Sequence, residues 1–313
     1  MGQIFTTKCD SDVRLDGKTA VITGANCGIG KETARDLYQR GATVILACRS
    51  VSKANEAIKE IKTQCVWERN VGQLKAIELD LSRLKSVRDC AANLLETEKE
   101  INILINNAGV FAVPFALTED GNETTFQVNH LGHFLLTLLL MPLLKKSTPV
   151  RIVTVSSSLH SAIWELDLSD MKYEKRKYGN IKAYNESKVC NILFTQELAR
   201  KLKENNLNGI TVYSVHPGAV KTEAGRYLDD AYFSGLYFVW SSVGTMFYKT
   251  PVQGAQTSIY CSVDEKCSNE TGLYYAECKP TKTSKLARNE KLAEELWDLS
   301  LKLVGLDSKS DLF

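Results

Sequence analysis

The sequence predicts an α/β protein built on a doubly wound parallel sheet. Short apolar segments rich in β-branched residues alternate with longer amphipathic segments along most of the 313 residues. The apolar segments are nearly continuous in hydrophobic character, which is typical of strands that helices cover on both faces. Strict alternation of strand and helix favours parallel strands, because each helix carries the chain back across the sheet in a right-handed crossover.

The expected elements follow in order along the chain. Buried strands are predicted at residues 19–23, 43–47, 74–78, 102–105, 151–155 and 210–214, with a short strand at 273–275. Amphipathic helices are predicted at 51–64 and 82–98, a core helix at 134–144, and a C-terminal helix at about 283–303. The apolar run at 134–144 is about half the ~20 residues that a membrane-spanning helix needs.

The chain reads as one domain with a tail and a lid. Residues 1–16 precede the first strand and form the tail, and residues 17–313 form the domain, without a linker or an internal repeat. Residues 223–250 interrupt the alternation. This segment is too aromatic for a solvated loop and too often interrupted by polar residues to cross a membrane. We interpret it as a small lid over a substrate site.

Composition excludes several functional classes. The net charge is only +2, whereas a nucleic-acid-binding domain usually carries a concentrated basic surface. Nine cysteines are scattered without a C-x-x-C pair, so we expect neither a metal site nor a disulfide framework. Reduced thiols and the lack of an N-terminal apolar run favour a cytoplasmic protein.

The N-terminus suggests a lipid anchor. Residues 1–6 read MGQIFT, which places Gly2 and Thr6 as N-myristoylation requires. Lys8 would add weak attraction to anionic lipid, and Cys9 is a candidate for palmitoylation. An ordinary N-terminal tail is the alternative. One myristoyl chain binds a membrane only marginally, so a second signal would be needed for peripheral attachment.

A glycine-rich turn follows the first strand directly. Residues 23–30 read TGANCGIG and lead into a helix. Glycines allow a tight turn and close approach to a pyrophosphate, and the free N–H groups of the helix start favour an anion. The alternative is a plain strand–helix turn. The context predicts a dinucleotide site on a Rossmann-type fold.

The spacing T-G-x-x-x-G-x-G resembles the short-chain dehydrogenase/reductase family. Further motifs appear in the family's order over residues 17 to about 225: NNAG at 106–109, Asn129, the Ser156–Ser157 pair, Y-N-E-S-K at 184–188, and HPG at 216–218. The resemblance implies coenzyme contacts at Thr23, Gly24, Asn26, Gly28, Ile29, Gly30, Asp80, Asn107, Ala108, Gly109, Tyr184, Lys188, Pro217, Gly218 and Thr222.

Tyr184 is the candidate proton donor and acceptor. Lys188 stands four positions later and shares its helix face. A phenol has a pKa near 10, and a neighbouring ammonium should lower that pKa toward the range useful for general acid–base catalysis. The resemblance adds that Lys188 holds the nicotinamide ribose, and that Ser157 and Asn129 complete the catalytic set, with Ser156 and Ser158 as alternatives to Ser157. Residues 159–182 form an insertion before Tyr184 that we expect to border the substrate site.

Arg49 points to NADP. An NAD enzyme usually carries Asp or Glu at the end of the second strand for the ribose 2′-hydroxyl, whereas residues 47–50 here read ACRS. A guanidinium suits the geometry of the 2′-phosphate. Lys31 and Lys53 are possible helpers.

Within the family, ILACRS, TTFQVNHLGHFLL and AYNESKVCNILF resemble the retinol dehydrogenases and the oxidoreductase domain of the WW-domain-containing oxidoreductase. This resemblance implies an apolar carbonyl or alcohol substrate, retinal-like or another lipid. An aromatic lid would suit such a substrate and contact a membrane surface. The family further suggests a homodimer through the long fifth and sixth helices. A steroid dehydrogenase and a nucleotide-binding scaffold with little turnover stay open as alternatives.

Overall fold

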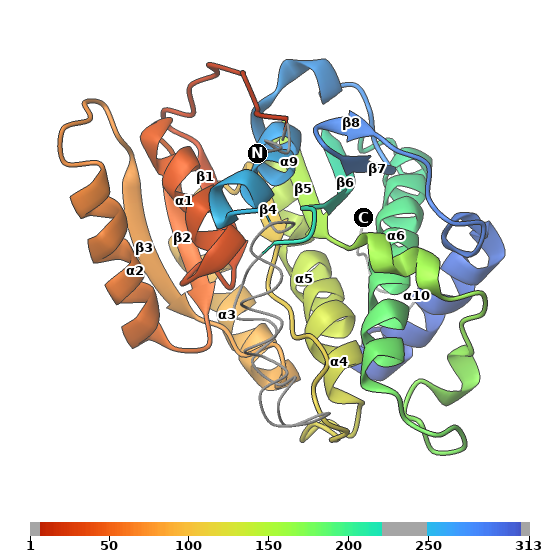
Figure 1. Ribbon diagram of the computed structural model, residues 1–313. Coiled ribbons are helices and arrows are strands. Elements are labelled where there is room, and N and C mark those ends of the chain that lie inside the picture. The colour runs from red at the N-terminus through yellow and green to blue at the C-terminus, as the bar shows by residue number, and fades with distance from the viewer. Residues whose placement is uncertain (1–6, 221–248, 308–313) are drawn as a thin grey trace, which may run out of the picture.

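An eight-stranded sheet organises the computed structural model, which describes residues 7–220 and 249–307. The strand order is β3-β2-β1-β4-β5-β6-β7-β8 (Figure 1). The strands are β1 (Thr19–Thr23), β2 (Thr43–Cys48), β3 (Gln73–Glu78), β4 (Ile103–Asn106), β5 (Val150–Val155), β6 (Ile210–His216), β7 (Leu273–Ala276) and β8 (Lys279–Pro280). All neighbouring pairs are parallel except β7 and β8, which form an antiparallel hairpin.

Helices cover both faces of the sheet, which confirms the doubly wound fold. They are α1 (Gly28–Gln39), α2 (Val51–Gln64), α3 (Leu84–Thr97), α4 (Thr124–Phe126), α5 (Gly132–Lys146), α6 (Asn180–Glu204), α9 (Pro251–Val263) and α10 (Glu290–Val304). One apolar core lies between the sheet and α3, α5, α6 and α10, and a second lies beneath α1, α2 and α9. A π-helical turn (Gln127–Leu131) joins α4 to α5.

The chain reverses direction across the sheet between β1 and β4. It starts at β1, extends outward through β2 to β3, and then returns to add β4 on the other side of β1. In open α/β sheets the crevice beyond the carboxyl ends of the strands at such a switch point is where ligands bind. The strands thereby place the loops after β1, β2, β4, β5 and β6 around one cleft.

Among the described residues, the helical stretch Thr124–Lys146 is long and apolar enough to cross a membrane, by its length and composition alone. However, 83% of its most apolar window is buried inside the structure. Its α5 portion packs against α3 in the first core. The expected core helix is therefore confirmed, and it is longer than residues 134–144.

The C-terminal helix α10 lies along α6. Trp297 of α10 stacks on Phe194 of α6 with ring centroids 6.1 Å apart, and meets Phe134 of α5 edge to face at 5.0 Å. Sixteen of the 25 residues of α6 are buried, which leaves this helix covered on nearly every side. The Y-N-E-S-K motif at 184–188 therefore lies on a helix that is held on several sides.

Part of the expected N-terminal tail packs on the domain. Arg40 donates to the main-chain oxygens of Ser11 and Val13, at 2.8 and 3.0 Å. Cys9 is buried, and its amide donates to Gln256 at 3.0 Å. The interpretation of Cys9 as a palmitoylation site is therefore wrong for this conformation, because an acyl chain cannot reach a buried thiol. Gly2 and Thr6 lie outside the described residues.

Candidate active site

A cavity of about 1060 Å³ opens at the carboxyl ends of the central strands. It brings together most of the residues that the sequence singled out. These are Gly24, Asn26, Gly28, Ile29, Gly30, Arg49, Asp80, Asn107, Ala108, Gly109, Ser157, Tyr184, Lys188, Pro217 and Gly218. Thr23 and Asn129 are buried behind its wall, and Thr222 lies outside the described residues.

The glycine-rich turn has no room for side chains. Gly24 has φ +65°, and a Cβ there would lie 2.9 Å from the Cβ of Ala108. A Cβ on Gly30 would lie 2.5 Å from Asn107 Nδ2 and 2.7 Å from the oxygen of Gly24. The backbone therefore forms a bare cradle at the N-terminus of α1, which fits a pyrophosphate group.

Thr23 joins this turn to the loop after β4. Its hydroxyl accepts hydrogen bonds from the amides of Asn107 and Ala108, each at 2.9 Å. The Asn107 side chain in turn donates to the main-chain oxygen of Thr23 at 2.8 Å. Two neighbouring strand ends are thus fixed as one surface of the cleft.

Asn129 lies inside the π-helical turn. Its side-chain oxygen accepts from the amide of Val110 at 2.8 Å, and its nitrogen donates to Val110 O and to Ser187 Oγ, both at 3.0 Å. These bonds tie the loop after β4 to the residue that precedes Lys188. π-helical turns are rare and often occur at functional sites.

Ser157 is the serine best placed beside Tyr184. The hydroxyl of Ser156 donates to the main-chain oxygen of Lys188 at 2.8 Å and is therefore occupied. A hydrogen bond between Ser157 and Tyr184 favours a lower pKa of the phenol, but burial outweighs it and raises the pKa of Tyr184 to about 12.

Lys188 does not lower the pKa of Tyr184 as the spacing suggested. Its Nζ donates to the main-chain oxygen of Val155 at 3.0 Å and lies 5.3 Å from the centroid of the Tyr184 ring. Burial lowers the pKa of Lys188 to about 8. The expectation of a lowered phenol pKa is wrong because desolvation of the half-buried ring outweighs the hydrogen bond with Ser157, and the Lys188 ammonium is directed to Val155 O instead.

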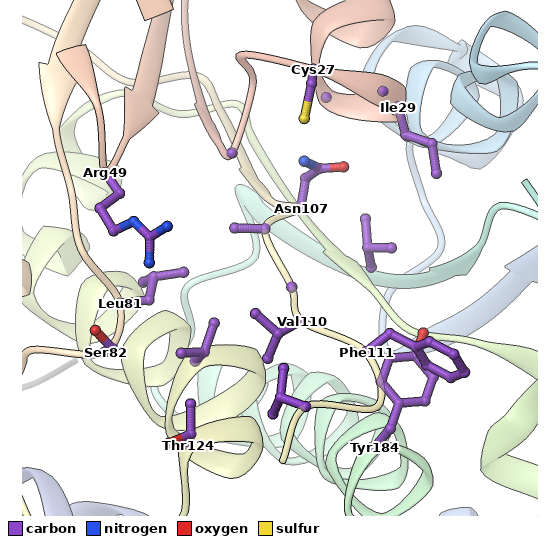
Figure 2. Close-up of a pocket in the computed structure, with 18 of the residues that line it drawn as sticks. Cys27, Ile29, Arg49, Leu81, Ser82, Asn107, Val110, Phe111, Thr124 and Tyr184 are labelled. Carbon is purple, nitrogen blue, oxygen red and sulfur yellow. The ribbon is translucent and has the colours of Figure 1, made fainter. Parts of the chain in front are cut away.

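Arg49 and Tyr184 stand at opposite ends of the cavity (Figure 2). Arg49 is exposed, and no carboxylate pairs with it in the part of the chain that the structure describes. Lys53 also lines this end, whereas Lys31 is paired with Glu60 at 2.7 Å and does not line it. Asp80 accepts from the amide and hydroxyl of Ser82, at 3.0 and 2.6 Å.

An apolar wall lines part of the cavity, and sequence reasoning missed it. The loop after β4 contributes Val110, Phe111, Val113 and Leu117, and Leu159 adds to the wall from the expected insertion. Phe111 meets the ring of Tyr184 edge to face, with centroids 4.7 Å apart and planes at 89° (Figure 2). The sequence offered one indication of this wall, because its residues in the loop after β4 directly follow the NNAG motif.

The insertion at 159–182 is anchored to the catalytic helix. Arg176 donates to Glu186 at 2.8 Å and to Asp170 at 3.2 Å, and Tyr173 donates to Glu186 at 2.6 Å. Tyr178 OH donates to the main-chain oxygen of Val113 at 3.1 Å. These bonds connect the insertion both to α6 and to the apolar wall, as expected for a segment that borders the site. The expected lid, residues 223–250, lies outside the described residues except for its last two positions, 249 and 250.

The fold and the site define a protein of the short-chain dehydrogenase type. The short chain dehydrogenase family matches residues 18–166. Human retinol dehydrogenase 12 is 46% identical over 95% of this chain and 90% of its own length, and human retinol dehydrogenase 11 is 47% identical over 95% and 89%. The chain belongs to the short-chain dehydrogenase/reductase family and is close to the retinol dehydrogenases.

Solved structures agree with this assignment. A crystal structure of an uncharacterized protein from Mycobacterium paratuberculosis superposes with a TM-score of 0.76 at 33% identity, covering 96% of this chain and 98% of that one. A short chain dehydrogenase from Escherichia coli CFT073, complexed with NADPH, shares the fold with a TM-score of 0.64 at 23% identity, covering 85% and 99%. The chain is therefore an oxidoreductase of a family that uses NAD or NADP and acts on CH–OH groups.

Proposed function

We propose that this protein is an NADP(H)-dependent oxidoreductase that interconverts an apolar carbonyl compound and its alcohol, most simply a retinal-like or other lipid aldehyde or ketone. The observation that carries the proposal is one cavity with the guanidinium of Arg49, which has no carboxylate partner among the described residues, at one end and Phe111 of the apolar wall beside Tyr184 at the other. A phosphorylated dinucleotide and a hydrophobic substrate are the two ligands that these ends suit.

The coenzyme preference rests on the end of β2. Arg49 follows Cys48 directly, and Lys53 adds a second cation on the same side of the cavity. Neither side chain has a carboxylate partner among the described residues, so both are available to a 2′-phosphate. An NAD enzyme would instead need an acidic group here to accept from the ribose hydroxyl.

Tyr184, Ser157 and Lys188 supply the acid–base chemistry. The bound coenzyme supplies or accepts a hydride at its nicotinamide ring. Tyr184 keeps its proton at neutral pH because burial raises its pKa to about 12, so the phenol can donate to the carbonyl oxygen during reduction. Ser157 stabilises charge that develops on that oxygen, and Lys188 and Asn129 hold the phenol and the neighbouring loop in place.

The substrate class follows from the wall beside Tyr184. Phe111, Val113 and Leu117 offer apolar surface and few polar partners, which disfavours a sugar or a small polar ketone. The relatives named retinol dehydrogenases act, by their names, on a lipid alcohol. Exposed apolar residues at the rim, Phe115 at 49% and Leu117 at 52% exposure, would suit delivery of a substrate from a lipid surface.

A coenzyme and substrate screen tests the proposal. Purified protein would be assayed with NADPH and NADH in parallel against all-trans-retinal, a medium-chain aldehyde, a 3-ketosteroid and a small sugar ketone. We expect reduction of retinal or the aldehyde with NADPH in clear preference to NADH. Turnover of the sugar alone, or a preference for NADH, would contradict the proposal, and selective turnover of the ketosteroid would favour the steroid dehydrogenase alternative.

Two further proposals concern location and assembly. We propose a cytoplasmic protein with peripheral membrane contact through the N-terminus or the rim of the cavity. A scaffold function with little turnover is less well supported, because a scaffold has no physical need for Asn129, Ser157, Tyr184 and Lys188 together around one cavity. A homodimer stays a prediction from the family resemblance.

A further inference from the structure

A buried histidine connects two parts of the candidate site. His133, in the first turn of α5, is 1% exposed. Its Nε2 lies 2.9 Å from the hydroxyl of Thr23, and its Nδ1 lies 3.2 Å from the main-chain oxygen of Asn129. One imidazole ring therefore bridges the end of β1, where the glycine-rich turn begins, and the π-helical turn that carries Asn129.

The hydrogen bonds at both ends fix the protonation state of this ring. Nδ1 must carry the proton because the carbonyl of Asn129 can only accept. The hydroxyl of Thr23 already accepts from the amides of Asn107 and Ala108, and its own proton can go either to Nε2 at 2.9 Å or to the main-chain oxygen of Ile105 at 3.5 Å. The shorter of these bonds, to Nε2, requires the neutral ring with its proton on Nδ1. Burial, with the positive charge of Lys188 acting in the same direction, lowers its pKa to about 4 and favours this form.

The two hydrogen bonds of His133 affect different parts of the candidate site. The Thr23 end fixes the loop 107–109, which forms the coenzyme side of the cavity. The Asn129 end fixes a residue whose side chain holds Val110 and Ser187, next to Lys188. Loss of the Thr23 bond should therefore loosen the coenzyme surface, and loss of the Asn129 bond should disturb the residues around Tyr184.

We propose that His133 is a positioning residue that sets coenzyme affinity through Thr23 and turnover through Asn129. The inference rests on the proposed function, since both tasks presuppose a dinucleotide in the cleft. His130 provides the natural contrast. It lies one turn earlier and is equally buried, but its Nε2 lies 2.9 Å from Ser300 Oγ of α10, away from the cavity.

Two conservative substitutions separate the two bonds. An asparagine at position 133 places its amide N–H where Nδ1 lies and keeps the bond to Asn129, but it does not reach Thr23. A glutamine places its amide oxygen where Nε2 lies and keeps the bond from Thr23, but it removes the imidazole N–H that donates to Asn129 O. NADPH dissociation constants from fluorescence titration, together with kcat at saturating NADPH with all-trans-retinal, report on the two tasks separately.

We expect His133→Asn to weaken NADPH binding about tenfold and to leave kcat nearly unchanged. We expect His133→Gln to lower kcat about tenfold and to leave NADPH binding nearly unchanged. A tenfold effect corresponds to the loss of about one buried hydrogen bond. His130→Asn and His130→Gln, the matched controls, should lower the unfolding temperature while leaving both quantities as in the wild type. Equal losses in both His133 variants, or effects on unfolding temperature alone, would overturn the inference. A wild-type protein that fails to bind NADPH or to reduce any carbonyl would contradict the proposed function instead.

Discussion

The rings of Phe111 and Tyr184 meet edge to face, with their centroids 4.7 Å apart. This contact joins the residue proposed as proton donor to the first aromatic residue of the apolar wall. It restricts the phenol ring from one side, and it leaves an apolar surface where the substituents of a bound carbonyl compound would lie. The identity of residue 111 should therefore affect substrate selection more than coenzyme binding.

Replacement of Phe111 tests the wall. An edge-to-face aromatic pair contributes about 0.5–1.5 kcal/mol beyond its buried area. We expect Phe111→Ala to raise KM for all-trans-retinal by about tenfold and to change KM for a short aliphatic aldehyde much less, because only the larger substrate fills the wall. Steady-state kinetics with both aldehydes would show this, and Trp67→Ala, which replaces an exposed aromatic residue that does not line the cavity, is the control. Equal effects on the two aldehydes would argue against a role in selectivity.

Tyr184→Phe removes the proposed proton donor while keeping the ring. General acid catalysis contributes about 10²–10⁴-fold to rate, so we expect kcat to fall within that range. NADPH binding should persist, because the glycine-rich cradle and Arg49 are untouched. Measurement of kcat alongside a fluorescence titration with NADPH separates the two. Retention of more than a tenth of the wild-type kcat would show that another group donates the proton.

Arg49→Ala should lower discrimination between the two coenzymes. Hydrogen bonds to charged groups contribute about 1.5–3 kcal/mol, which corresponds to roughly a 10- to 150-fold loss of affinity for NADPH. Affinity for NADH should change little, since NADH has no 2′-phosphate. Isothermal titration with both coenzymes measures the ratio. Lys31→Ala serves as control, because Lys31 is paired with Glu60 and does not line the cavity. A matching loss for NADH would mean that Arg49 has a structural role only.

Buried neutral histidines predict a loss of stability in acid. Burial lowers the pKa of His130 to about 3 and of His133 to about 4, while both titrate near 6.5 in an unfolded chain. A depressed pKa means that the unfolded state binds protons first as the pH falls. The stabilisation is complete above about pH 6.5 and is lost progressively toward pH 4, at about 1.4 kcal/mol per pH unit for each histidine.

Urea unfolding at pH 7, 6, 5 and 4 measures this dependence. The His130→Gln variant should show a shallower decline than the wild type between pH 6.5 and 4, because it has one titrating group fewer. Parallel curves for the two proteins would show that His130 does not contribute to the acid sensitivity.

The sequence predicted the strands, α2 and α3 closely because these segments have distinct periods, whereas it gave no range for α6 or α9. It missed β8, which is only two residues long and depends on positive φ angles at Glu277 and Cys278, of 52° and 56°. The C-terminal helix begins at Glu290 rather than near residue 283, since Asn289 caps it by accepting from Leu292 N at 3.2 Å. Such ends depend on single side chains that no periodic pattern reports.

The candidate site was predictable where motifs stand at fixed positions, as at 184–188 and 23–30. The interactions around those motifs were not. Desolvation of Tyr184, the direction of the Lys188 ammonium toward Val155 and the bridge through His133 all depend on elements distant in sequence. The apolar wall likewise became visible only when the loop after β4 and the insertion were placed side by side.

The packing of α10 along α6 restricts how copies of this chain can associate. Trp297 is 3% exposed and lies between α10 and α6, so the face of α6 that packs on α10 is closed to a second copy of the chain. A homodimer, which stays a prediction, would therefore have to use a face of α5 or α6 that α10 does not cover.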